Sequence, residues 1–339
     1  MSDYIAYAAA RETQAEALDA AVARLTVSVT GLADAGLLAG PGPVFVGIGA
    51  SLAAACAPVW ALRSRGIDSW RLGAGDHPLP FPGNAHPVFA VSQSGRSTET
   101  LAVLESIDPA LRYGVVNQVP SPIAVRASDL LDLGSIPDSY ASTIGYTATV
   151  TALGMLADAW DGGRIDPGWA GLGQVFATVG RELDEQVREL APLFETAAFA
   201  DFVGAGPAVG SAEAAALLFR EVARIPSTGM STRQYLHGAM ESAGGGVHVF
   251  FGDAREHTVA RTLADAGHRA IVVSDEPVSP GPLLHVVRVP RLPAAQRAVL
   301  DILVAQILVE AVAGVRGVDI EEFVFHDAGT KVAVEGSTV

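Results

Sequence analysis

Short, continuously apolar segments that alternate with helix-length segments are the feature that most constrains the fold of this chain. In the first half they lie at 44–48, 88–91, 113–117 and 130–133, and in the second half at 199–206, 247–251, 270–274 and 284–289. Strands that are apolar on both faces are typical of parallel sheets covered by helices on each side. The sequence therefore predicts an α/β protein whose sheets are mainly parallel.

The order of these elements occurs twice along the 339 residues. A helix-length segment precedes each series, at 3–37 and at 174–194, and a glycine- and aspartate-rich stretch at 160–173 reads as the linker between them. A repeat of half the chain is typical of two similar domains. We expect domains at 1–165 and 174–339, each a flavodoxin-like three-layer arrangement of helices around a parallel sheet.

Composition restricts the partners of the chain. A formal net charge of −15 argues against nucleic acid, because duplex binding depends on clustered cations. The net charge does not exclude a small anion as ligand, since backbone N–H groups at a helix N-terminus bind phosphate without net positive charge. The N-terminus lacks a basic segment followed by an apolar one, and no uninterrupted apolar run suggests a membrane span. The expected location is the cytoplasm, with no membrane partner.

The run SQSGRSTET at 92–100 follows an apolar strand and precedes a helix. Gly95 allows the backbone to approach a ligand, and four neighbouring hydroxyls, Ser92, Ser94, Ser97 and Thr98, supply neutral donors. Helix capping is the ordinary alternative, but a cap needs only one hydroxyl. Open α/β sheets bind ligands at the carboxyl ends of their strands. The pattern therefore favours an anion site.

The second half carries GDAREH at 252–257 in the corresponding place, with an aspartate in place of the hydroxyls. Only the first half is therefore expected to bind an anion. The first glycine turn, at 47–51, lacks the spacing and the acidic residue of a dinucleotide fingerprint, which disfavours a nucleotide-binding oxidoreductase. No His, Asp or Glu cluster has persuasive metal-ligand spacing, so neither a metal nor a cofactor is expected.

Lys331 is the only lysine among 22 basic residues. Composition alone explains a lone lysine by chance. Lysine, unlike arginine, deprotonates readily and attacks carbonyl groups. Lys331 is therefore a candidate nucleophile.

Several of these stretches together resemble the double-SIS (sugar isomerase) family, which includes the isomerase half of glucosamine-6-phosphate synthase. In the first half the similar stretches are VFVGIGAS, SQSGRSTETL and YASTIGYTATV. In the second half they are FVGAG, the segment AEAAALLFREVARIPSTGMSTRQYLHGAMES and the tail GTKVAVE. The resemblance extends from about residue 40 to the C-terminus.

The resemblance implies a role for each matching residue. The residues that would bind the sugar phosphate are Ser51, Ser92, Gln93, Ser94, Ser97 and, along the sugar, Ser142. Glu221 matches the carboxylate that moves a proton, and Lys331 matches the lysine that condenses with a ketose carbonyl. His237 matches the ring-opening histidine, which in the family reaches the site of a neighbouring subunit, so a homodimer is expected.

Each of these residues also has an ordinary explanation, and some positions depart from the family. Glu221 could form a surface ion pair with Arg224, His237 could cap or pack, and Lys331 could be a solvated charge. Leu218 replaces a family lysine, and Arg96 replaces the glutamate of the Ser-Gln-Ser-Gly motif. The acidic residue before the Ala-Ser-Thr turn is replaced, with Pro137 and Asp138 nearby, and no amidotransferase domain precedes this region. These departures argue against glucosamine synthesis.

The expected function is isomerisation of a hexose or amino-hexose 6-phosphate, with or without release of an amine. Two alternatives stay open. One is a deglycase of fructosyl-amino-acid 6-phosphates, and the other is a non-catalytic regulatory protein that binds a sugar phosphate.

Overall fold

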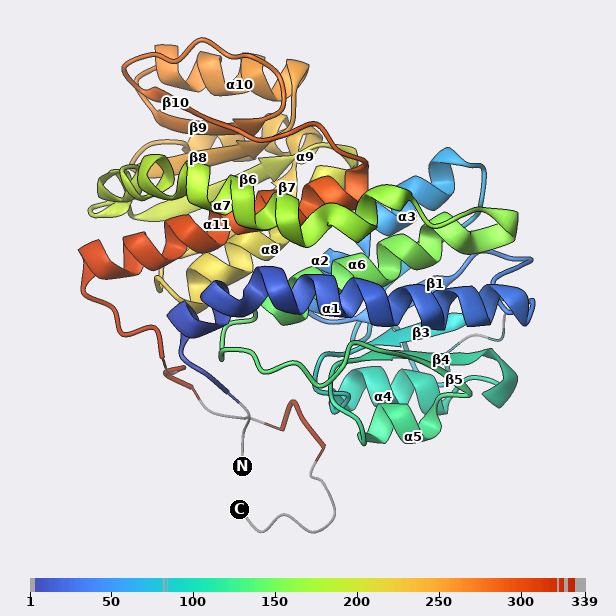
Figure 1. The fold of residues 1–339 in the computed structure, drawn as a ribbon. Helices are drawn as coiled ribbons and strands as arrows, with labels where there is room; N and C mark the ends of the chain where they lie inside the picture. Colours follow the sequence, from blue (N-terminus) through green and yellow to red (C-terminus); the bar gives the residue numbers. More distant parts are fainter. Residues whose placement is uncertain (1–3, 82, 84, 322, 326–328, 333–339) are drawn as a thin grey trace. The chain divides into compact units, whose positions relative to one another are not determined.

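A computed structural model describes residues 4–81, 83, 85–321, 323–325 and 329–332 of the chain (Figure 1). Two compact units form, one from residues 1–173 and 323–339 and the other from Gln174–Glu322. Each contains a five-stranded parallel sheet flanked by helices, which confirms the predicted fold class. The sequence assigned the C-terminal tail to the second domain, but its described residues group with the first unit.

The sheet of the first unit has the strand order β2-β1-β3-β4-β5. Its strands are β1 (Val44–Gly47), β2 (Trp70–Gly73), β3 (Val88–Val91), β4 (Arg112–Val116) and β5 (Asp129–Asp132). Its helices are α1 (Tyr7–Asp34), α2 (Ala50–Ala54), α3 (Cys56–Ser64), α4 (Thr98–Glu105), α5 (Pro122–Arg126) and α6 (Ile144–Ala159), with short 3-10 turns at Pro109–Leu111, Trp160–Gly162 and Pro167–Gly171.

The core of the first unit forms where the central strands meet aromatic side chains. All residues of β1 and β3 are buried. Phe89 contacts Phe45, Tyr113 and Trp160, with ring centroids 5.7, 4.7 and 6.3 Å away. Because both faces of these strands are buried, the helices have to cover the sheet on both sides.

The second unit repeats this topology with the strand order β10-β9-β8-β6-β7. Its strands are β6 (Phe199–Gly204), β7 (Ser227–Ser231), β8 (Gly246–Phe251), β9 (Arg269–Ser274) and β10 (Leu284–Arg288). Its helices are α7 (Leu172–Arg188), which begins at the boundary, α8 (Val209–Glu221), α9 (Thr232–Leu236), α10 (Ala254–Asp265) and α11 (Ala294–Arg316), with 3-10 turns at Ala191–Phe194, Gly206–Ala208 and Ala239–Ser242.

Two strands were not expected from the sequence, namely β2 in the first sheet and β7 in the second. Both lie at a sheet edge. No residue of β2 (Trp70–Gly73) is fully buried, and β7 (Ser227–Ser231) consists of small or polar residues apart from Met230. Neither segment is a continuous run of buried apolar residues, so the pattern that located the other strands did not identify these two.

Helix α11 (Ala294–Arg316) is long and apolar enough, by length and composition, to span a membrane. In the structure 78% of its most apolar window is buried, and the helix packs against α8 within the second unit. Buried polar residues Asp301 and Gln306 lie on it, and the Asp301 carboxylate accepts a hydrogen bond from Ser211 at 2.9 Å. These features are those of a core helix.

Both sheets reverse their strand order at an equivalent point. In the first unit β1 has β2 on one side and β3 on the other, and in the second unit β6 lies between β7 and β8. Loops leaving the carboxyl ends of the two strands at such a point diverge to opposite faces of the sheet and leave a crevice where α/β proteins bind ligands. The two units therefore offer two equivalent edges for a site.

Candidate functional site

The serines predicted to bind phosphate lie on both sides of the switch point of the first unit. Ser51 is in α2, directly after β1, and Ser92 follows the neighbouring strand β3. Gly47 ends β1, and a Cβ atom there would lie only 3.0 Å from the Ser51 Cβ and 3.1 Å from the Val91 carbonyl oxygen. The absence of a side chain at Gly47 thus lets the two serine-bearing loops approach each other.

Residues 92–97 form a tight turn that leads into α4. The Ser92 and Ser97 hydroxyls are 2.9 Å apart, and the Gly95 N–H donates to the Ser92 carbonyl at 3.0 Å. Gly95 has φ 61°, and a Cβ atom there would collide with the Ser121 side chain. Ser97 is the N-cap of α4, yet its hydroxyl makes no capping bond. The turn is therefore more than a helix cap, since the Ser97 hydroxyl contacts Ser92 instead.

Asp138 holds this turn against the loop before α6. Its carboxylate is 4% exposed and accepts hydrogen bonds from Gln93 Nε2 and Ser142 Oγ, both at 2.9 Å. It also accepts from Thr143 Oγ1 at 2.6 Å and from the backbone N–H of Gly145 at 2.9 Å. A buried carboxylate surrounded by donors is well satisfied and rigid. Asp138 thus fixes the orientation of Gln93 and Ser142, two predicted binding residues.

The sequence singled out Asp138 only as a neighbour of a replaced acidic residue. The glycine at 145 leaves room for Gln93 to reach Asp138, because a Cβ atom there would clash with both side chains. An acidic residue followed closely by Ser, Thr and Gly is a recognisable signal for a carboxylate that caps a turn. The long-range bond to Gln93, 45 residues earlier, leaves no trace in the local pattern.

Lys331 lies beside the hydroxyl turn of the same unit. Its backbone forms an antiparallel bridge with Ser97. On either side of it, the Thr98 N–H donates to the Thr330 carbonyl at 3.2 Å and the Val332 N–H donates to the Arg96 carbonyl at 2.9 Å. The Lys331 residue itself is exposed. The tail therefore places the lone lysine next to the predicted phosphate-binding serines.

Arg96 explains one departure from the family motif. Its Nε donates to the Val332 carbonyl oxygen at 2.8 Å, while its own carbonyl accepts from the Val332 N–H. A guanidinium donates to a carbonyl oxygen, and a glutamate carboxylate in this place has no proton to give. The arginine thus attaches the tail directly to the turn that carries Ser94 and Ser97.

Glu221 and His237 belong to the second unit. Glu221 is the last residue of α8, and burial raises the pKa of its carboxyl from 4.5 to about 7. Arg224 lies beyond the end of that helix, at φ 52°, and donates to the Asp319 carbonyl at 3.1 Å. The helical spacing on which the ion-pair explanation of Glu221 depended is therefore not present.

His237 follows α9 (Thr232–Leu236) as its C-cap residue and is exposed. Its N–H donates to the Gln234 carbonyl at 3.1 Å, and Gly238 with φ 138° turns the chain away. Nearby, Tyr235 is buried and its hydroxyl contacts His248 Nδ1 at 3.0 Å. His237 is therefore an exposed imidazole at the end of a short helix whose preceding residues are anchored in the core.

Comparison with known proteins identifies the fold. Neither a protein-family model nor a curated protein sequence matches the chain. Among solved structures, the C-terminal domain of glucosamine-fructose-6-phosphate aminotransferase from Francisella tularensis matches with TM-score 0.78 at 16% identity, over 94% of this chain and 98% of that one.

Two further structures match over nearly their whole length. Tagatose-6-phosphate ketose/aldose isomerase from Escherichia coli has TM-score 0.76 at 14% identity, covering 96% of this chain and 99% of that one. Glucosamine-6-phosphate deaminase from Thermotoga maritima has TM-score 0.71 at 20% identity, covering 92% and 97%. The chain has the double-SIS fold. The expected relationship is thereby confirmed at the level of the fold.

Within this double-SIS fold, the hydroxyl turn, the Asp138 carboxylate and the tail form one connected site in the first unit. Its donors are neutral hydroxyls, an amide and the N-terminus of α4, with an exposed ammonium group alongside. Such a set suits a small anion better than a cation. The donors are therefore of the kind from which a small anion accepts hydrogen bonds, and the backbone of Lys331 adjoins them.

Replacement of Arg96 by methionine is predicted to loosen the tail while the fold persists. The variant keeps the aliphatic stem and loses the bond from Nε to the Val332 carbonyl, so the backbone bonds around Lys331 should open more often. Hydrogen exchange measured by mass spectrometry should become faster in the peptide containing residues 329–332. Arg126→Met, which removes an ion pair with Glu105 in the same unit, is the control. Unchanged exchange in Arg96→Met would show that Arg96 does not hold the tail.

Proposed function

We propose that this protein is a sugar-phosphate isomerase that acts on a hexose or amino-hexose 6-phosphate. The observation that carries the proposal is the backbone bridge between Ser97 and Lys331, which joins the residue bearing a primary amine to a turn lined with hydroxyls. We assign the turn to the phosphate of a ligand and the amine to a carbonyl group of the same ligand. Sugar phosphates carry both groups.

Binding is assigned to the serines of the first unit. The ligand phosphate accepts hydrogen bonds from Ser51, Ser92, Ser94 and Ser97 and from the backbone at the start of α4, while Gln93 and Ser142 contact the phosphate or sugar. Asp138 is a positioning residue, because its buried carboxylate accepts hydrogen bonds from Gln93 and Ser142 and so holds both. The chain's net charge of −15 makes recognition by local hydroxyl donors the more important.

The chemistry is assigned to Glu221, His237 and Lys331. Aldose–ketose isomerisation moves a proton between adjacent carbons, and a carboxylate with a pKa of about 7 is half ionised at neutral pH and suits this task. His237 transfers the proton that opens the sugar ring. Lys331 condenses with the ketose C2 carbonyl, releasing water and forming an imine that favours loss of the C1 proton.

The substrate class follows from the groups that the site provides and from the solved structures of the same fold. The three named above are an aminotransferase domain, an isomerase and a deaminase of hexose 6-phosphates or amino-hexose 6-phosphates. They support this substrate class. One experiment distinguishes the three reactions, which are isomerisation, amine release and deglycation of a fructosyl-amino-acid 6-phosphate.

That experiment is incubation with fructose 6-phosphate, glucosamine 6-phosphate and a fructosyl-amino-acid 6-phosphate, with product detection by mass spectrometry and by an ammonia assay. Isomer formation supports the isomerase, and ammonia or free amino acid assigns the deaminase or deglycase. Binding of a sugar phosphate with no product for any of them would contradict an enzyme and support a regulatory binding protein.

A homodimer is part of the proposal, because the family resemblance implies that His237 completes the site of a neighbouring subunit. Light scattering should give twice the chain mass of 34.9 kDa. A monomer with full activity would contradict this arrangement.

The double substitution Ser92→Ala/Ser94→Ala is predicted to abolish tight binding of sugar phosphate. Each lost hydrogen bond to a charged group costs about 1.5–3 kcal/mol, so affinity should fall at least about a hundredfold. Titration calorimetry with fructose 6-phosphate measures the change. Ser28→Ala/Ser64→Ala, which makes the same chemical change elsewhere in the first unit, should bind normally. Normal binding by Ser92→Ala/Ser94→Ala would place the phosphate elsewhere.

The pH dependence of turnover should follow Glu221. As a base it must be ionised, so kcat/KM should rise with pH and level off above about 7. Glu221→Gln should lose turnover while retaining substrate binding, whereas Glu182→Gln, at an exposed position of α7, should change neither. A profile that shows no ionisation near pH 7 would assign the proton transfer to another group.

Stability gives an independent readout of the same carboxyl. Its folded pKa of about 7 exceeds the ordinary 4.5, so the folded state binds the proton more tightly and wild-type stability falls as pH rises between these values. The Glu221→Gln variant has no ionisable group at this position, so its stability does not fall for this reason. Chemical denaturation should therefore show the variant gaining stability relative to wild type from pH 5 to pH 8.

Lys331 is predicted to form a trappable imine. Treatment with fructose 6-phosphate and borohydride reduces the C=N bond to a stable secondary amine, which peptide mass spectrometry locates on the C-terminal peptide. Lys331→Arg keeps the charge but lacks a nucleophilic amine, so trapping and turnover should both disappear while binding persists. Because the chain has no other lysine, the N-terminal amine is the only competing position. Full turnover in Lys331→Arg would contradict the imine and would assign the mechanism to proton transfer by Glu221 and His237 alone.

A further inference from the structure

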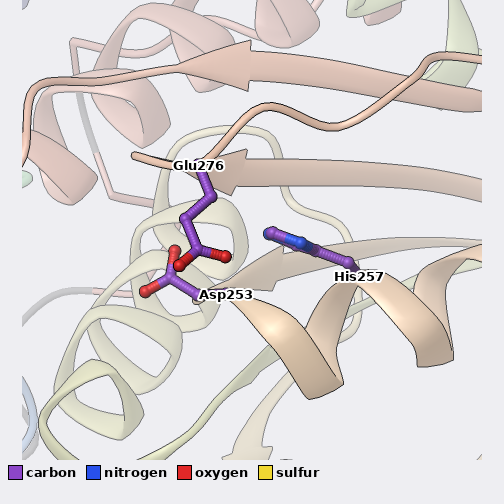
Figure 2. A group of neighbouring side chains, drawn as sticks. All are labelled: Asp253, His257 and Glu276. Carbon is purple, nitrogen blue, oxygen red and sulfur yellow. The ribbon is translucent and has the colours of Figure 1, made fainter.

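We propose that Asp253, His257 and Glu276 form a binding site for a divalent transition-metal ion in the second unit. One ligand atom from each of the three side chains lies within 4.8 Å of the others. The three side chains come from two neighbouring segments of the second unit and point toward one another, as Figure 2 shows. Asp253 follows β8 and is the N-cap of α10, His257 lies on the first turn of that helix, and Glu276 follows β9.

The three donor atoms are close enough to bind one ion after a modest movement. Oxygen and nitrogen ligands lie about 2.0–2.2 Å from Zn²⁺, so two ligands of a tetrahedral ion are about 3.3–3.6 Å apart. The donor atoms here lie within 4.8 Å of one another. Side-chain rotations at Asp253 and Glu276 that shorten these separations to the tetrahedral value of about 3.3–3.6 Å would close the site around an ion.

A buried serine holds two of the donors in place. Ser274, at the end of β9, is fully buried, and its hydroxyl donates to Asp253 Oδ1 at 2.7 Å and lies 2.8 Å from His257 Nε2. Because this hydroxyl donates to Asp253, the contact with His257 needs the proton on Nε2. Coordination through Nε2 would release that proton, whereas coordination through Nδ1 would not. Ser274 thus holds the side chains of Asp253 and His257 in orientation without itself being a ligand.

The charges around this place are mixed. Asp253 and Glu276 bring two carboxylates together, whereas the N-terminal end of α10 and the arginines Arg233, Arg255 and Arg291 of the neighbouring cavity wall are positive. Arg297, an arginine of the neighbouring cavity wall, pairs with Asp275 at 3.3 Å and with Asp301 at 2.8 Å. Its charge is thus taken up by other acids, and a bound divalent ion would neutralise the carboxylates of Asp253 and Glu276.

The donor set selects the kind of ion. One imidazole nitrogen with two carboxylate oxygens suits Zn²⁺ or Mn²⁺, because Mg²⁺ and Ca²⁺ prefer oxygen ligands alone. Three protein ligands leave further coordination positions for water or another ligand. Asp253 is also part of the wall of a cavity of about 510 Å³ at the same sheet edge, which gives solvent molecules access to the site.

The position in the fold is equivalent to that of the phosphate turn. In the first unit the hydroxyl turn follows β3, and in the second unit Asp253 follows β8, the corresponding strand next to the switch point. The two edges share one topology and differ in their side chains. We infer that the second edge binds a cation where the first binds an anion. The inference is independent of the proposed isomerase function.

Titration calorimetry tests the site on untagged, EDTA-treated, full-length protein with ZnCl₂, MnCl₂ and MgCl₂ in separate experiments. One equivalent of Zn²⁺ or Mn²⁺ should bind, with Mg²⁺ at least tenfold weaker. His257→Gln and Glu276→Gln should each weaken binding at least tenfold. Asp265→Asn, a matched loss of charge at the exposed end of the same helix, should bind as wild type does.

Thermal unfolding gives a second readout, since an ion that binds the folded state raises Tm. The wild type and Asp265→Asn should show the rise with Zn²⁺ or Mn²⁺, and His257→Gln and Glu276→Gln should not. The proposal would be overturned if the wild type did not bind one ion per chain. It would also be overturned if His257→Gln and Glu276→Gln both bound the ion as tightly as the wild type does, because the binding would then be adventitious only. Sugar-phosphate binding by these variants should stay unchanged, which separates this result from a failure of the proposed function.

Discussion

Burial of both faces of two parallel sheets is the constraint on which the rest of the structure depends. Strands such as β1, β3 and β8 have no face left for solvent, so helices must cover each side and every connection must cross over. All strands of a sheet then point in the same direction, and their carboxyl ends gather at one edge. Each unit thereby acquires one edge, at the point where its strand order reverses, of the kind at which α/β proteins bind ligands.

What each edge can bind depends on the few residues that leave these strands. In the first unit they are hydroxyls, held by the Asp138 carboxylate and joined to the tail through Arg96. In the second unit they are two carboxylates and an imidazole, held by Ser274. Under the two proposals, the duplicated scaffold binds an anion at one edge and a cation at the other. The fold is common to proteins that act on hexose phosphates, and the chemistry of this chain lies in these substitutions.

The parts that sequence reasoning missed become strands or site residues through contacts with distant segments. Strands β2 and β7 lack a continuous apolar run and are strands because they pair with β1 and β6. Asp138 was seen only as a departure, since its bond to Gln93 spans 45 residues. The spacing of Asp253 and His257 is visible in the sequence, but Glu276 joins them only because β8 and β9 pair side by side. Pairing of distant segments is set by tertiary packing, which local patterns do not carry.

The sequence by itself determined the fold class, the duplication, the central strands and the hydroxyl turn. Apolar runs and helix-length spacings record which faces must be buried, and a cluster of hydroxyls around Gly95 is a local property. Only the tertiary structure decided that the described residues of the tail group with the first unit, that Lys331 lies beside Ser97 and that burial raises the pKa of Glu221 to about 7. Each of these depends on contacts between residues far apart in the chain, and desolvation of a carboxyl is a property of everything packed around it.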